Sequence, residues 1–379
     1  MPVALRDDDA LRLQVLLTQA PQAVRIDEPA MRVEALTARG AAAVELHPSG
    51  RSDEYLRAVR ELLSSQVLGS PGGYPVFLRR WTRMGQARDG ILERLLLLGE
   101  PEAVVAVVHA PGLTEELARR AWWACPSPEN ARRMLATRRV ATSAMAPVLA
   151  RYLLEYLPFE EEPRAAMDTV RLVLAADGVE PEVHLRLWQG GRHRVACQVG
   201  FLAARPETLP ATRPPHPDWA ALRQRLAPLC DGGDPYARGL GRSLDAPGQA
   251  FLHVTEQALQ RVGDPDVAVA LLDAIGRFFG AAAPWPGGDR PDPAAGLAQV
   301  ALAAEALCRA PPPELVAVLD AVPALRDPLA AMLTLGCAGE RAVAPILART
   351  DAVGSLLRRK LQPVIAPLLA RMACLQGAR

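Results

Sequence analysis

The first seventy residues contain three short runs in which apolar and polar side chains alternate. In each run the apolar side chains occupy every second position: Val24 and Ile26, then Met31, Val33 and Ala35, then Val44 and Leu46. Turn-forming residues separate the runs, at Asp27–Pro29 and at Arg39–Gly40. A period of two is typical of strands that are half-buried, so the pattern predicts a short antiparallel meander.

The segment that follows changes to helical spacing. Apolar residues recur three and four positions apart at Tyr55, Leu56, Val59, Leu62 and Leu63. Ser52 precedes them as a candidate N-cap, because its hydroxyl can accept a hydrogen bond from a free amide of the first turn. The two patterns together predict a small N-terminal β-β-β-α element.

From Tyr74 onward the pattern is almost entirely helical, in short segments separated by proline and glycine. Thr114 and Ser127 are candidate N-caps, and Pro101 and Pro128 stand where a first helical turn tolerates proline. The acidic clusters at Asp7–Ala10 and Phe159–Pro163 favour helix starts, where the helix dipole stabilises negative charge.

These helices predict a mainly α fold of stacked antiparallel helix pairs, a HEAT-like array. The segment Ile91–Gly99 is apolar almost all round, so it needs neighbours on both sides, although no strict repeat period is present. Five prolines in Arg205–Asp218 exclude a helix there and predict a linker, and Ala283–Pro293 predicts a surface loop. The predicted domains are a small α+β unit at 1–70, a helical array at 71–210 and a second helical region at 211–379.

Charge and hydropathy narrow the functional classes. The chain is 50% hydrophobic, and its formal net charge of +1 lacks the global positive field of a non-specific nucleic-acid binder. Its N-terminus is acidic rather than basic, and no stretch approaches the roughly 20 apolar residues that span a bilayer. We therefore expect a soluble cytoplasmic protein without membrane insertion.

Motifs for catalysis or metal binding are scarce. The six cysteines are far apart and form no C-x-x-C pair, which favours reduced thiols. His184, His193 and Cys197 cluster without the further ligands that zinc needs. G-x-S-x-G and H-E-x-x-H are missing, and the glycine-rich stretch Gly69–Pro75 lacks the lysine of a phosphate loop. The sequence therefore predicts no catalytic residue, no metal site and no cofactor, and leaves an unrecognised enzyme or thiol carrier as the least favoured class.

Paired arginines near tryptophans give the one candidate binding face. Its residues are Arg79, Arg80, Arg83, Arg119, Arg120, Trp123, Arg132 and Arg133. Guanidinium planes and indole rings together can bind anions, aromatic groups or unpaired bases. The competing and commoner arrangement is a solvated arginine surface over a tryptophan-containing core, in which Trp81 is buried and Arg79, Arg80 and Arg83 point outward.

The same region carries a resemblance to a known family. The stretches "DEYLRAVRELLSSQVLGSPGGYPVFLRRWTRMGQ" and "LLLLGEPEAVVAVVHAPGLTEELARRAWWACPSPENARRML", within about Ser52–Leu135, resemble the DsrS family. That family is encoded with the reverse dissimilatory sulfite reductase system of sulfur-oxidising bacteria. The resemblance implies a cytoplasmic accessory protein that supports the oxidation of stored sulfur, with a regulatory role also considered.

Two functional hypotheses follow. The first is a non-enzymatic scaffold that binds partner proteins of the sulfur-oxidation machinery. The alternative is a regulator of sulfur-oxidation gene expression that contacts RNA through the arginine and tryptophan face.

Overall fold

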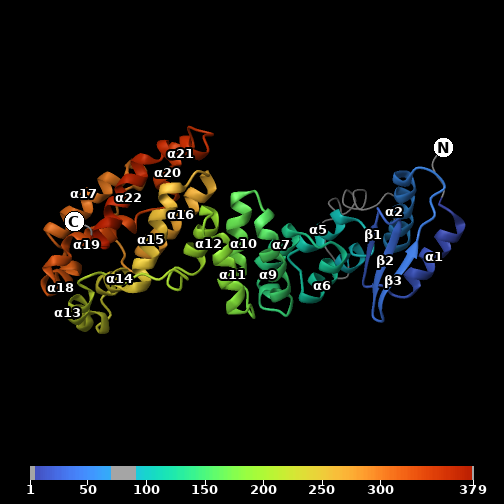
Figure 1. Cartoon of the computed structure of the whole chain (residues 1–379), viewed down its shortest axis with the longest axis horizontal. Helices are drawn as coiled ribbons and strands as arrows, with labels where there is room; N and C mark the ends of the chain where they lie inside the picture. The colour runs from blue at the N-terminus through green and yellow to red at the C-terminus, as the bar shows by residue number, and fades with distance from the viewer. Residues whose placement is uncertain (1–4, 70–90, 378–379) are drawn as a thin grey trace. The chain divides into compact units, whose positions relative to one another are not determined.

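The structure of the chain, a computed structural model, describes residues 5–69 and 91–377. Helices account for most of these residues, and the strands form one three-stranded sheet near the N-terminus (Figure 1). The predicted mainly α class with a small N-terminal β element is confirmed. Contacts divide the chain into two compact units, the first formed by Met1–Tyr156 with Ala176–Glu180 and the second by Leu157–Ala175 with Pro181–Arg379.

The first unit begins with the sheet and its two flanking helices. They are α1 (Asp7–Thr18), β1 (Ala23–Asp27), β2 (Arg32–Thr37), β3 (Gly40–Glu45) and α2 (Ser52–Leu68). The strands pair antiparallel in the order β1-β2-β3, with Val33 opposite both Ile26 and Val44, as the alternation predicts. The predicted β-β-β-α element omits α1, although the acidic cluster at Asp7–Ala10 does mark its start.

One face of this sheet carries the core of the N-terminal element. Leu13 and Leu16 of α1 and Leu63 of α2 pack on it with Val33, and all four are buried. The carboxylate of Asp9 is also fully buried, where it accepts hydrogen bonds from the Tyr55 hydroxyl (2.6 Å) and from the backbone amide (2.7 Å) and ring (3.0 Å) of His47.

Six further helices complete the described part of the first unit. They are α4 (Ile91–Leu95), α5 (Pro101–His109), α6 (Glu115–Ala124), α7 (Pro128–Ala136), α8 (Arg138–Ala141) and α9 (Met145–Tyr156). The predicted caps of α6 and α7 are confirmed, because the Thr114 hydroxyl accepts from Leu117 N (3.2 Å) and the Ser127 hydroxyl from Asn130 N (3.1 Å). The predicted Ser52 cap is wrong: Ser52 is already the first residue of α2, and Arg51 stands at the cap without a side-chain bond.

The second unit contains helices and short 3-10 turns. Its elements are η1 (Leu157–Phe159), α10 (Pro163–Ala175), α11 (Pro181–Gly191), α12 (Val195–Ala204), α13 (Trp219–Asp231), α14 (Pro235–Leu244), α15 (Ala246–Arg261), α16 (Pro265–Gly280), η2 (Pro293–Ala295), α17 (Leu297–Arg309), α18 (Pro313–Ala321), η3 (Pro323–Leu325), α19 (Arg326–Leu335), α20 (Glu340–Leu347), α21 (Gly354–Lys360) and α22 (Gln362–Leu375). Proline stands in the first turn of many of them, where its missing amide costs no helical hydrogen bond.

Two helices of this unit are buried almost all round. In α12 every residue from Ala196 to Leu202 is buried, and in α19 every residue from Leu329 to Leu335 is buried. Over residues 5–69 and 91–377 no single helix is both long enough and apolar enough to cross a membrane. Two consecutive helical segments, Pro323–Leu335 and Glu340–Leu347, have the required length and apolarity only when taken together, and the chain bends between them.

The proline-rich segment Arg205–Asp218 contains no helix and lies inside the second unit. There the backbone amide of His216 donates to the carbonyl of Leu244 at 2.9 Å. The predicted domain boundaries at residues 70 and 210 stay predictions.

Candidate functional site

The predicted arginine and tryptophan face is described only in part. Arg79, Arg80 and Arg83, together with Trp81, lie outside the described residues, so their orientation stays a prediction. Its other five members lie on α6 and α7.

The two arginines of α6 share one acidic partner. Nε of Arg120 and a terminal nitrogen of Arg119 each lie 2.7 Å from Oε1 of Glu116. These hydrogen bonds, that from Arg119 first, lower the pKa of Glu116 to about 2. Arg119 also donates to the side-chain oxygen of Gln22 at 2.9 Å. An anionic ligand at these arginines would therefore compete with a carboxylate that already occupies them.

Trp123 contacts an arginine that the sequence pattern did not indicate. The guanidinium of Arg25, on β1, lies 4.7 Å from the centre of the Trp123 ring and donates to the Trp123 carbonyl at 3.1 Å. Trp122 packs edge-on against Tyr152, with ring centres 4.8 Å apart. On α7, Arg133 is exposed and Arg132 is half-buried. On α6, Arg119, Arg120 and Trp123 are therefore each paired with another residue, and the role of the face in binding stays a prediction.

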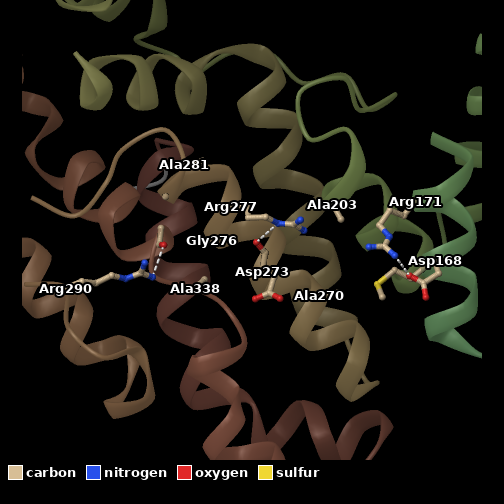
Figure 2. Close-up of a pocket in the computed structure, with 13 residues that line it drawn as sticks. Asp168, Arg171, Ala203, Ala270, Asp273, Gly276, Arg277, Ala281, Arg290 and Ala338 are labelled. Carbon is tan, nitrogen blue, oxygen red and sulfur yellow. Dashed lines mark hydrogen bonds and ion pairs between the residues drawn. The ribbon is translucent and has the colours of Figure 1, made fainter. Parts of the chain in front are cut away.

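The second unit contains a cleft of about 570 Å³ that carries three arginines (Figure 2). Arg171 comes from α10, Arg277 from α16 and Arg290 from the loop that follows α16. In Figure 2 the guanidinium groups of Arg290, Arg277 and Arg171 follow one another across the view, with Asp273 and Asp168 beside them. All three arginines are exposed to solvent, as a binding group must be.

Small residues let the backbone of two elements meet in this cleft. A Cβ on Gly276 would lie 2.0 Å from the carbonyl oxygen of Ala338, and a Cβ on Gly280 would lie 2.8 Å from that of Gly336. Helix α16 therefore touches the α19–α20 connection without any side chain between them. Part of the cleft surface therefore consists of glycine and alanine residues. Their small side chains leave space in the cleft for a bound peptide.

Both carboxylates of the cleft already hold bonds inside the protein. Asp168 pairs with Arg171 at 3.0 Å, one turn away on α10. Asp273 accepts from the backbone amide of Glu340 at 2.9 Å, so this side chain of α16 caps the start of α20. Asp168 therefore occupies one of the three cleft arginines, whereas Arg277 and Arg290 form no ion pair among the described residues and keep donors for an added anion.

Two of the cleft arginines are anchored by backbone carbonyls. Nε of Arg277 donates to the carbonyl of Asp273 at 3.2 Å, and Arg290 donates to the carbonyl of Gly336 at 3.1 Å. Each guanidinium has five N–H donors, so these single bonds orient the group and leave most donors unused. The arrangement suits planar carboxylates, which a guanidinium binds through two parallel hydrogen bonds.

The cysteines lie mostly in the interior. All six are free, and Cys197, Cys308 and Cys337 are buried. Burial raises the pKa of Cys197 to about 11, and it also raises the pKa of Cys337 although Arg290 beside it acts in the opposite direction. Neither thiol is therefore readily ionised, and the thiol-carrier interpretation loses support. Among the described residues no three His, Cys, Asp or Glu side chains converge as metal ligands would.

Comparison with protein-family models, curated proteins and solved structures found no match.

Proposed function

We propose that this chain is a non-enzymatic cytoplasmic accessory protein of bacterial sulfur oxidation that acts by binding partner proteins. Its resemblance to the DsrS family supplies the biological setting. The proposal includes a HEAT-like arrangement of the helices, which the packing supports: α5 packs on α7, α7 on α9, α10 on α12 and α17 on α19. Contact between helices two apart in the chain is typical of stacked helix pairs.

The observation that carries the proposal is the cleft of Arg171, Arg277 and Arg290. Three guanidinium groups border a surface that is partly glycine and alanine. Asp168 pairs with one of them, Arg171, and Asp273 is bonded to the backbone amide of Glu340. The ligand that fits is an extended acidic segment of a partner protein, whose Asp and Glu side chains reach the arginines. Binding rather than catalysis is proposed because Asp168 and Asp273 serve as an ion-pair partner and a helix cap.

RNA binding through the arginine and tryptophan face remains the alternative, with less support. Arg119 and Arg120 hold Glu116, and Trp123 lies against Arg25, so a ligand would have to displace existing partners. Arg79, Arg80 and Arg83 lie outside the described residues and add no observation in its favour.

The test replaces the two cleft arginines that anchor no other element, as Arg171→Ala with Arg277→Ala. The matched control is Arg223→Ala with Arg359→Ala, two exposed arginines on α13 and α21. The probe is a labelled Asp- and Glu-rich peptide followed by fluorescence anisotropy, beside a single-stranded RNA of equal charge. Each lost charge-assisted bond is worth about 1.5–3 kcal/mol, so we expect the peptide affinity to fall at least about tenfold in the cleft variant only.

The outcomes separate the two hypotheses. Equal peptide binding by the cleft variant and the control would remove the cleft from the proposal. Tight RNA binding whose affinity falls steeply with salt, and which the cleft variant retains, would favour the regulator instead. The biological setting is checked separately, by quantifying which proteins of sulfur-oxidising cells the wild-type protein and the cleft variant retain at high salt.

A further inference from the structure

A second cavity of the second unit, about 500 Å³ in volume, differs from the arginine cleft in its charge. It is formed by the end of α11, the start of α12, the segment that precedes α13, and α15. Two arginines, two histidines and one tryptophan line it: Arg192, Arg261, His193, His253 and Trp188. Among the described residues that line it, none carries a carboxylate, whereas the arginine cleft has two.

Arginines lie directly against both imidazoles. Nε of Arg192 is 3.1 Å from Nε2 of His193, and a terminal nitrogen of Arg213 is 2.9 Å from Nδ1 of His253. Glu256, also on α15, does not line the cavity, and its carboxylate oxygens accept from Gln260 and Gln376, each at 3.4 Å. Two guanidinium groups thus line the cavity and a third, that of Arg213, contacts His253, with no acidic residue in the lining. A bound anion would stabilise this arrangement.

A buried amide holds two of these cationic segments in place. Gln198 is only 3% exposed. Its side-chain oxygen accepts from Arg261 at 2.8 Å, and its side-chain nitrogen donates to the backbone carbonyl of Arg192 at 2.9 Å. A buried polar side chain with both ends bonded fixes the geometry around it, so the Arg261 guanidinium and the backbone of Arg192 are positioned before any ligand arrives.

The pKa of His253 is consistent with a positively charged cavity. Burial first, and then the positive charge of Arg213, lower its pKa, while Glu256 acts in the opposite direction. His253 is therefore neutral near pH 7 in the free protein, and an anion beside it would favour its protonation.

We propose that this cavity binds a small phosphate-bearing molecule. Arg192 and His193 of the α11–α12 turn and His253 and Arg261 of α15 line the space together, and groups from two separate segments suit a tetrahedral oxyanion better than a planar carboxylate. The volume is in the range of small-molecule sites. Trp188 is held edge-on against Phe201, with ring centres 5.0 Å apart, so its indole offers a fixed surface beside the anion. The site is separate from the arginine cleft and does not depend on the proposed function.

Isothermal titration with inorganic phosphate and with adenosine monophosphate tests the proposal on the full chain. We expect saturable binding of at least one of them, weakened at least tenfold by Arg192→Ala with Arg261→Ala. The matched control is Arg223→Ala with Arg359→Ala, two exposed arginines outside both cavities, and it should bind as the wild type does. Arg213→Ala provides a second test in an exposed segment, in case the first variant fails to fold.

Comparing phosphate with adenosine monophosphate tests whether the Trp188 indole contacts the ligand. Tighter binding of the nucleotide, reduced by Trp188→Leu, would assign the indole to ligand contact, and equal affinities would restrict the site to the phosphate group. Failure of both ligands to bind below about 10 mM, or equal binding by the cavity variants and the control, overturns the proposal. A failure here leaves the acidic-peptide test of the other cleft unaffected.

Discussion

At the scale of single residues, the most telling group is the buried carboxylate of Asp9. Burial alone would raise its pKa, but the hydrogen bonds from Tyr55 and His47 outweigh burial and leave the pKa below its ordinary value of 3.8. Burial and the neighbouring Asp9 in turn raise the pKa of Tyr55 to about 12. From the sequence, Asp9 was predicted only as part of an acidic helix start. Its burial and hydrogen bonds could not be predicted, because its two partners lie 38 and 46 residues away along the chain.

This group predicts how the stability of the first unit depends on pH. A carboxyl whose folded-state pKa is depressed stabilises the fold above its unfolded pKa, and that contribution is lost as the pH falls through the folded value. We expect Tyr55→Phe to lower the free energy of unfolding by about 1.5–3 kcal/mol at pH 7, the usual value of a hydrogen bond to a charged group. The deficit should shrink below about pH 4, where Asp9 becomes protonated in the unfolded chain.

Urea unfolding at pH 7 and at about pH 3 measures both effects. The control is Tyr152→Phe in the same unit, because the Tyr152 ring packs on Trp122 and its hydroxyl makes no hydrogen bond among the described residues. A deficit of Tyr55→Phe that stays constant between the two pH values would show that the hydroxyl does not stabilise an ionised Asp9.

At the scale of elements, most local signals predicted the structure correctly, the Ser52 cap excepted, whereas contacts between elements could not be predicted. The strand alternation, the caps at Thr114 and Ser127 and the first-turn prolines depend on neighbouring residues, so the sequence predicted them correctly. The cleft unites Arg171, Arg277 and Arg290 from distant parts of the chain, and arginine is too frequent here for any one to stand out. The spacing of Gly276 and Gly280, four residues apart on α16, is the one local signal that could have indicated a close backbone approach.

That approach gives a prediction about helix packing. In Gly276→Ala the new Cβ would lie 2.0 Å from the carbonyl oxygen of Ala338, which is backbone and cannot rotate away. We expect α16 to separate from the α19–α20 connection, at a cost of about 3 kcal/mol, the upper end of the usual range for overpacking. Thermal unfolding should show the loss, together with weaker binding of the acidic peptide to the cleft.

Gly190→Ala on α11 is the matched control. Nothing lies within 4 Å of a Cβ at Gly190, so alanine there should leave stability unchanged or raise it by up to about 1 kcal/mol. If the two substitutions have the same effect, α16 does not touch the α19–α20 connection in solution.

At the scale of the whole molecule, the sequence and the structure suggest different domain boundaries. The proline-rich segment predicts a domain that begins at residue 211, whereas the contacts include Leu157–Ala175 and Pro181–Ala204 in the second unit. Proline content reports only that a segment cannot be helical. Whether a segment separates two domains depends on the contacts between the residues before it and the residues after it. A local sequence pattern does not predict those contacts.

Helix α12 decides between the two divisions, and it gives the last prediction. All its residues from Ala196 to Leu202 are buried, and it packs on α10, α15 and α16. On α10 the contact is tight, since a Cβ on Gly200 would lie 2.7 Å from the Val170 side chain. A fragment 211–379 lacks α12 and would expose the apolar faces of α15 and α16 that it covers. A fragment 157–379 keeps them covered.

We therefore expect 157–379 to fold alone, with a helical circular dichroism spectrum and one cooperative thermal transition. Fragment 211–379 should be less helical and aggregate or melt without a sharp transition, because uncovered apolar surface removes about 25 cal/mol of stabilisation per Å². The comparison also has a clear adverse outcome. If 211–379 melts as cooperatively as 157–379 and at the same temperature, α12 is dispensable, and the boundary lies at the proline-rich segment as its composition predicts.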